Sequence, residues 1–163
     1  MLTFSQATAL ALTSLSLYGV SISTLSTSVI AGEPIIDRNC RYHVRTQEVL
    51  RQIPQRNHAR VFSTSQFQVN NQKYVLQLLK FPNSTGVLCL WKPHTRLPQR
   101  LKDVSIIQDK VIEKLEKHPD QPATYIVTVK GDESGDILNT AYRLNLTNPE
   151  QPKVTPLIRV YKK

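Results

Sequence analysis

Three runs rich in apolar and β-branched residues in the middle of the chain predict antiparallel β-strands, and in the first run apolar and polar residues alternate. The first run ends at Asn70-Asn71, a pair that readily adopts the positive φ angles of a tight hairpin turn. The second run is apolar on both faces, as expected of a central strand, and the turn-forming stretch 82–86 separates it from the third. The pattern predicts a meander with strands at 60–69, 73–81 and 86–92.

The same alternation returns in the last third of the chain, where it predicts three further strands. They cover residues 123–130, 137–147 and 153–161. Pro156 lacks a backbone N–H, so we expect the last strand at a sheet edge or with a bulge. A shorter alternating stretch, 39–45, predicts one more strand, with Cys40 facing inward.

Between these strand regions, residues 100–117 carry apolar side chains at spacings of three and four, the pattern of an amphipathic helix that Pro119 would end. Many of these side chains are β-branched and disfavour a helix, so a hairpin turning at Asp109-Lys110 is the alternative. The predicted fold is α+β: an antiparallel sheet or open barrel of about six to seven strands with one helix at about 100–117. The expected apolar helix face consists of Leu101, Val104, Ile107, Val111, Ile112 and Leu115.

The first charged side chain of the chain is Glu33, and the apolar residues before it are diluted by many Ser and Thr. This apolar run is shorter than the ~20 residues of a spanning helix, and small side chains lie around Ala31. We therefore predict a signal peptide over 1–31 and one globular domain, 32–163, exported to the periplasm or secreted. Because no Lys or Arg precedes the apolar run, the alternative is an uncleaved anchor in which residues 7–31 tether the domain to a membrane.

Cys40 and Cys89 are the only cysteines of the chain, and in an oxidising compartment such a pair predicts a disulfide. One alternative is a pair of buried free thiols. The other is a zinc site in which His43 and His94 join the two cysteines. On a regular strand His43 falls on the opposite face from Cys40, which disfavours the zinc site.

The net charge of +9 is confined to the first half of the predicted domain. Residues 32–102 carry twelve basic and three acidic side chains, with none acidic between Val49 and Lys102, whereas 103–163 carry nine of each. A region of one sign attracts polyanions, and arginine forms paired hydrogen bonds with phosphate or sulfate. The alternative is surface charge that only keeps the protein soluble. The predicted anion-binding residues are Arg51, Arg56, Arg60, Arg96 and Arg100.

The leading functional hypothesis is a non-enzymatic exported basic domain that binds an anionic polymer or surface: acidic polysaccharide, lipid headgroups or nucleic acid. One alternative is a secreted phosphodiester-cleaving hydrolase that uses His58 and His94. Another is an envelope module whose edge strand 153–161 pairs with another protein. The sequence lacks the common nucleophile, metalloprotease and nucleotide-binding motifs, and we predict neither cofactor nor metal.

Three further signals are weak. The acidic stretch 131–136 lacks the ligand spacing of a calcium-binding hand and predicts a solvated hairpin loop. Asn83 and Asn145 begin N-glycosylation sequences, which matter only in an organism that glycosylates its exported proteins. Phe62 and Tyr74 are able to stack a sugar or a base, although strand propensity accounts for them equally.

Overall fold

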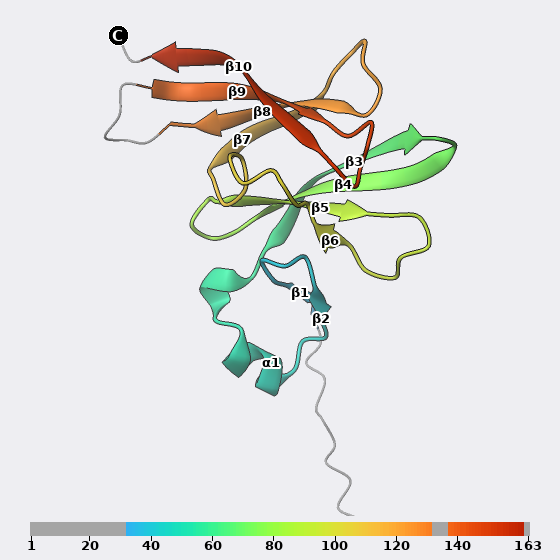
Figure 1. The fold of residues 1–163 in the computed structure, drawn as a ribbon. Helices are drawn as coiled ribbons and strands as arrows, with labels where there is room; N and C mark the ends of the chain where they lie inside the picture. The colour runs from blue at the N-terminus through green and yellow to red at the C-terminus, as the bar shows by residue number, and fades with distance from the viewer. Residues whose placement is uncertain (1–31, 132–136, 162–163) are drawn as a thin grey trace, which may run out of the picture.

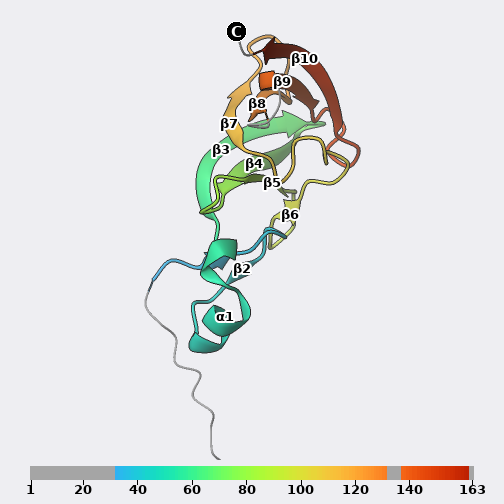
Figure 2. The same cartoon turned by 90° about the vertical axis from the view of Figure 1, so that its left-hand side faces the viewer.

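The computed structural model describes residues 32–131 and 137–161. Its main body consists of two four-stranded antiparallel sheets that face each other (Figure 1, Figure 2). The first sheet has the order β3-β4-β5-β6, with strands Arg60–Val69, Gln72–Lys80, Gly86–Trp91 and Gln99–Arg100. The second has the order β10-β9-β8-β7, in which β7 is Ile112–Lys117, β8 is Thr124–Lys130, β9 is Ile137–Asn145 and β10 is Lys153–Tyr161.

A small N-terminal unit precedes the two sheets. It contains the hairpin β1 (Ile35–Ile36) and β2 (Tyr42–His43), the helix α1 (Gln47–Gln52) and the 3₁₀ turn η1 (Gln55–Asn57). The unit lies on the side of the first sheet that faces away from the second sheet (Figure 1, Figure 2). Thr46 precedes α1, and its hydroxyl accepts a hydrogen bond from the Val49 N–H and so caps the helix.

The main hydrophobic core lies between the two sheets. Alternate residues of each strand point into it, because successive side chains of a strand leave on opposite faces. The segment between β6 and β7 closes one side of this core with Leu101, Val104 and Ile107. The fully buried side chains contributed by the sheets include Leu76, Leu78, Leu88, Leu90, Tyr125, Val127 and Leu144.

A second, smaller core covers the outward face of the first sheet. Leu79, Val87 and Cys89 point outward from β4 and β5 and are nonetheless fully buried. The N-terminal unit covers them with Ile36, Cys40 and Ala59, and Phe81 completes the cluster. β5 is consequently buried on both faces from Gly86 to Leu90, which explains its continuous apolar run.

The strands predicted from alternation are present, with small shifts of their ends. Asn70 and Asn71 have φ angles of 49° and 61°, as the hairpin turn between β3 and β4 requires. β10 combines both expectations for a strand that contains Pro156: it is the edge of its sheet, and its register shifts between Pro156 and Ile158. The described strands do not close into a barrel, and the pairing is that of a sandwich.

The predicted helix at 100–117 is wrong. β6 ends at Arg100, a series of turns follows, and Ile112–Lys117 is strand β7. β6 and β7 belong to different sheets, so the alternative of a hairpin is wrong as well. The β-branched residues favour a strand, and Asp109, with a φ angle of 57°, ends the single helix-like turn that begins at Val104. The only helices of the described residues are α1 and η1, so the fold is mainly β.

Gln108 replaces a neighbouring strand along part of β5. Its buried side-chain amide accepts a hydrogen bond from the Leu88 N–H (2.9 Å) and donates to the Leu88 and Leu101 carbonyl oxygens (3.1 and 3.0 Å). The chain then passes Gly86, which pairs with Lys110, and enters β7. A Cβ at Gly86 would lie 3.0 Å from Leu78 Cδ1 and 3.2 Å from Ile112 Cβ, so a larger residue there would force these side chains to shift.

Two sequence predictions lie outside the described residues. They are the signal peptide or anchor at 1–31 and the acidic loop within 131–136, of which only Gly131 is described. Within the part of the chain that the structure describes, no helix is long and apolar enough to span a membrane.

Candidate anion-binding site

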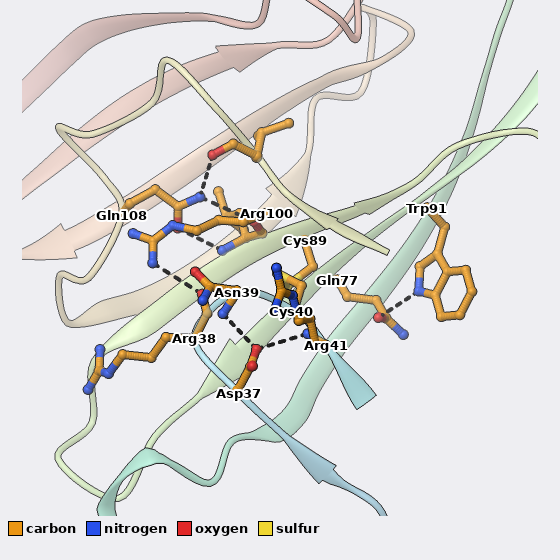
Figure 3. Close-up of a disulfide and its surroundings, with 12 residues drawn as sticks. Asp37, Arg38, Asn39, Cys40, Arg41, Gln77, Cys89, Trp91, Arg100 and Gln108 are labelled. Atoms are coloured by element: carbon orange, nitrogen blue, oxygen red, sulfur yellow. Dashed lines mark hydrogen bonds between the residues drawn. A yellow bond between two sulfur atoms is a disulfide. The ribbon is translucent and has the colours of Figure 1, made fainter. Parts of the chain in front are cut away.

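The Cys40–Cys89 disulfide joins the N-terminal hairpin to the first sheet (Figure 3). This confirms the predicted bond and excludes the free-thiol and zinc alternatives, because both sulfur atoms are bonded to each other. Cys89 lies on β5 as predicted. Cys40 instead lies in the turn between β1 and β2 with a φ angle of 65°, so the predicted strand 39–45 is reduced to Tyr42–His43.

Asp37 shapes the turn that contains Cys40. One carboxylate oxygen accepts hydrogen bonds from the Asn39 and Arg41 N–H groups, at 2.8 and 2.9 Å (Figure 3). The other oxygen lies 3.0 Å from His43 Nε2. Partial burial would by itself raise the pKa of Asp37, but the hydrogen bonds from His43, Arg41 and Asn39 together outweigh it and lower that pKa. The carboxylate therefore fixes where the Asn39 and Arg41 side chains leave the turn.

Asp109 forms a bridge between two arginines beside the disulfide. It pairs with Arg38 Nη1 at 3.1 Å and with Arg100 Nη2, and Arg100 also donates to the Arg38 carbonyl oxygen. Arg38 further donates to Thr85 Oγ1 and lies over the Phe81 ring, 4.2 Å from its centroid. Arg38 and Arg100 are thus both held by neighbouring groups and share the single carboxylate of Asp109.

An open hollow of about 1050 Å³ borders Arg100 and lies between the β1–β2 turn and the segment 95–108. Four cations line it, Arg41, Arg96, Arg100 and Lys102, together with the carboxylate of Asp103. Leu97 and Pro98 give it an apolar side. We call this site, lined by Asn39, Arg41, Thr95–Asp103, Val104, Ser105 and Gln108, the basic hollow.

Three of the four cations of the basic hollow are exposed and have no carboxylate partner among the described residues. These are Arg41, Arg96 and Lys102, in contrast to Arg100. They share one concave surface, a shape that focuses the potential of like charges. An anion entering the hollow would meet guanidinium and ammonium N–H donors without displacing a protein carboxylate from those three groups.

The structure brings together only part of the predicted set. Arg96 and Arg100 line the basic hollow. Arg60 lies at the start of β3 and lines a different hollow, and Arg51 and Arg56 are exposed on α1 and η1, away from both. The five arginines therefore do not meet in one hollow.

Sequence reasoning missed Arg41 and Lys102 as parts of this site, and Arg38 as the neighbour that holds Asp109 and Arg100 beside it. The available signal was the predicted disulfide itself, because a bond between Cys40 and Cys89 also places the neighbours of both cysteines together. Arg38 and Arg41 flank Cys40, and Arg100 pairs with Cys89 on the adjacent strand β6.

The histidine pair of the hydrolase alternative is not assembled into a common site. The His58 ring bonds the Ile53 carbonyl oxygen at 2.8 Å and so completes the turn after α1. His94 is exposed in the loop between β5 and β6, with a φ angle of 62°. In the ranges 32–131 and 137–161 no group of three or more His, Cys, Asp or Glu residues is arranged to hold a metal ion.

Comparison of the chain with protein-family models, with curated proteins and with solved structures finds no match. We therefore infer a function from the charges and the shape of the basic hollow.

Proposed function

We propose that this protein is an exported, non-enzymatic domain that binds an anionic polymer or surface through the basic hollow. The observation that supports this most is the placement of Arg41, Arg96 and Lys102 around one concave surface without carboxylate partners in the described chain. An anion with several sulfate, phosphate or carboxylate groups would relieve the repulsion among these cations.

The contrast with Lys92 makes the case more specific. Lys92 lies in the same basic half of the sequence, yet its ammonium pairs with Glu150 at 2.5 Å. The Glu150 carboxylate neutralises the charge of Lys92. Positive charge that serves only solubility does not have to be gathered on one concave surface. Arg41, Arg96 and Lys102 have no carboxylate partner in the described part of the chain, so their charge stays available at one place.

Export is the second part of the proposal. The disulfide is compatible with an oxidising compartment. We propose that residues 1–31 direct the chain there as a signal peptide, so that the ligand is found outside the cytoplasm.

A pair of charge-matched variants tests the proposed site. The first carries Arg41→Gln, Arg96→Gln and Lys102→Gln, and the control carries Lys73→Gln, Lys117→Gln and Lys153→Gln, three exposed lysines outside the basic hollow. Binding to immobilised heparin, an anionic polymer, is titrated as a function of salt. We expect the hollow variant to lose affinity by about tenfold or more, with a salt slope smaller by about 2–3, and the control to change little.

Equal losses in the two variants would show that total charge, and not the basic hollow, governs binding. No retention of the unmodified oxidised domain at low salt would overturn the proposal altogether.

A second candidate function rests on β10. This edge strand exposes Ile158 and Tyr161 to 64% and 58%, and an unpaired strand edge is able to pair with another chain. The register shift at Pro156 counts against it, because bulges and prolines protect edges. Site-specific crosslinking from Ile158 in the native cell fraction tests this candidate: one discrete crosslinked partner supports it, and a diffuse or absent product contradicts it.

A further inference from the structure

A second concave surface lies at the end of the first sheet where β3 begins and β4 ends. It has a volume of about 510 Å³ and is lined by His58, Arg60, Val61, Phe62, Lys80, Phe81 and Pro82. We call it the aromatic hollow. The register of β3 and β4 shifts between Val61 and Ser63, and Phe62, the extra residue, is 57% exposed.

Arg60 and Lys80 form a cross-strand pair of like charge in this hollow. They lie directly opposite each other on β3 and β4, an arrangement that destabilises a sheet. Neither pairs with a carboxylate of the described chain; instead the Lys80 ammonium lies 3.6 Å from the Phe62 ring centroid. Two opposed cations beside an exposed aromatic ring would be stabilised by an anionic ligand with an apolar face.

A continuous series of contacts connects the two hollows. Phe81 lines the aromatic hollow and carries the Arg38 guanidinium on its ring. Arg38 pairs with Asp109, and Asp109 pairs with Arg100, which lines the basic hollow. The Asp109 carboxylate already contacts two guanidinium groups. It therefore places no unpaired negative charge between the two hollows that would repel an anionic ligand.

The separation of the hollows requires a ligand with several charges. Lys80 lies opposite Gly86 of β5, and Arg100 lies opposite Cys89 of the same strand. Three residues of an extended strand separate these two positions by about 10 Å along β5. β4 and β6 lie on either side of β5, which adds about 10 Å across the sheet. A single sulfate or carboxylate group cannot contact both hollows.

We infer that one extended acidic polysaccharide, with sulfate or carboxylate groups along its length, contacts both hollows at once. The inference rests on the proposed anion-binding function of the basic hollow and names its ligand class. Proteins that bind single-stranded nucleic acid stack successive bases on several aromatic rings. Here Tyr74 is buried against Phe67, with ring centroids 5.3 Å apart, and Phe81 is buried under the Arg38 guanidinium. Among the described residues that line the two hollows, Phe62 is therefore the one exposed Phe or Tyr ring. An acidic sugar carries charged groups beside an apolar ring face, which matches the placement of Phe62 beside Arg60 and Lys80.

Heparin fragments of increasing length provide the test, with the oxidised domain and two variants. The first variant, Arg60→Gln with Lys80→Gln, removes the like-charge pair and should unfold at the same or a higher temperature than the unmodified domain. The second is the basic-hollow variant Arg41→Gln, Arg96→Gln and Lys102→Gln. We expect short fragments to bind the first variant as well as the unmodified domain, and long fragments to bind the unmodified domain at least tenfold more tightly than short ones. The Arg60/Lys80 variant should lose this gain.

The outcomes separate the two proposals. If long fragments keep their full advantage in the Arg60/Lys80 variant, or show none with the unmodified domain, the inference is overturned while binding at the basic hollow stands. If the basic-hollow variant binds all fragments normally, the proposed function fails as well. Tighter binding of oligo(dT), or of vesicles rich in anionic lipid, than of the long heparin fragments would overturn the polysaccharide assignment.

Discussion

The two sheets of this protein share one core but differ in what lies on their outer faces. The first sheet is covered on its outer face by the N-terminal hairpin and the disulfide, so that Leu79 and Val87 are buried although they point away from the second sheet. The second sheet leaves Ile158 and Val160 of β10 exposed on its outer face, at 64% and 47%. The covered sheet is also the one that borders both hollows.

This difference connects stability with function. A hairpin with only two paired strand positions has little stability alone, and here it is held by a covalent bond and a small core. The same attachment places Arg41 opposite Arg96 and Lys102 in the basic hollow. We therefore expect changes on the outer face of the first sheet to affect both folding and binding, and changes on the outer face of the second to affect neither.

Removal of the disulfide should have the largest effect. The bond joins residues 49 positions apart, and loss of the loop constraint in Cys40→Ser/Cys89→Ser is expected to lower the free energy of unfolding by about 4 kcal/mol. The measurement is urea unfolding of residues 32–163, followed by heparin affinity of the folded fraction. A variant that unfolds at the same urea concentration as the oxidised protein would show that the hairpin is held without the bond.

Matched truncations on the two outer faces compare the sheets directly. Leu79→Ala removes a fully buried side chain and should cost about 2–5 kcal/mol. Ile158→Ala removes an exposed one and should change the free energy of unfolding by at most about 0.5 kcal/mol. Similar costs for the two variants, measured by chemical unfolding, would mean that the outer face of the second sheet is covered in solution.

Gln108 gives a smaller test at the edge of the first sheet. In Gln108→Leu the buried Leu88 N–H and the Leu101 carbonyl oxygen lose their partner, for an expected cost of about 2–3 kcal/mol. Gln99→Leu, at an exposed position on β6, is the control and should be close to neutral. If Gln108→Leu is also neutral in thermal unfolding, β5 does not depend on this side chain for its pairing.

Asp37 should give the smallest effect, and the one that depends on pH. Because its folded-state pKa is lowered, the carboxylate stabilises the fold above its ordinary pKa, and this contribution is lost as the pH falls below about 4. Asp37→Asn should therefore cost about 1 kcal/mol at pH 7 and progressively less in acid. Asp120→Asn, at an exposed position, is the comparison. A cost for Asp37→Asn that stays constant from pH 7 to pH 3 would contradict the hydrogen-bonded carboxylate.

Alternation was sufficient to predict the meander and the last three strands, because each has one face in the common core. It failed at 100–117 for an instructive reason. Leu101, Val104, Ile107 and Ile112 do point into the core, as the helical spacing implied, but they do so from turns followed by a strand. A helix and a turn followed by a strand both allow this spacing of buried residues. The contacts that favour the turn and strand, from Gln108 to Leu88 and from Lys110 to Gly86, are long-range.

Only part of the basic hollow could be predicted from the distribution of charge along the sequence. The concentration of cations before Lys102 pointed to the correct half of the chain, and Arg96 and Arg100 do share a hollow. Arg41 is brought there by the disulfide, and Arg51 is carried away by α1. The position of Arg41 follows only from the long-range pairing of Cys40 with Cys89, and that of Arg51 from a short helix that the sequence did not predict.

The most direct measurement is a nuclear magnetic resonance titration of the isotope-labelled, oxidised domain with a short heparin fragment. If the basic hollow is the binding site, the amide signals of Asn39 to Arg41 and of 95–105 shift first, and those of β9 and β10 stay in place. Shifts confined to the second sheet, or no shifts at low salt, would contradict the assignment of the site.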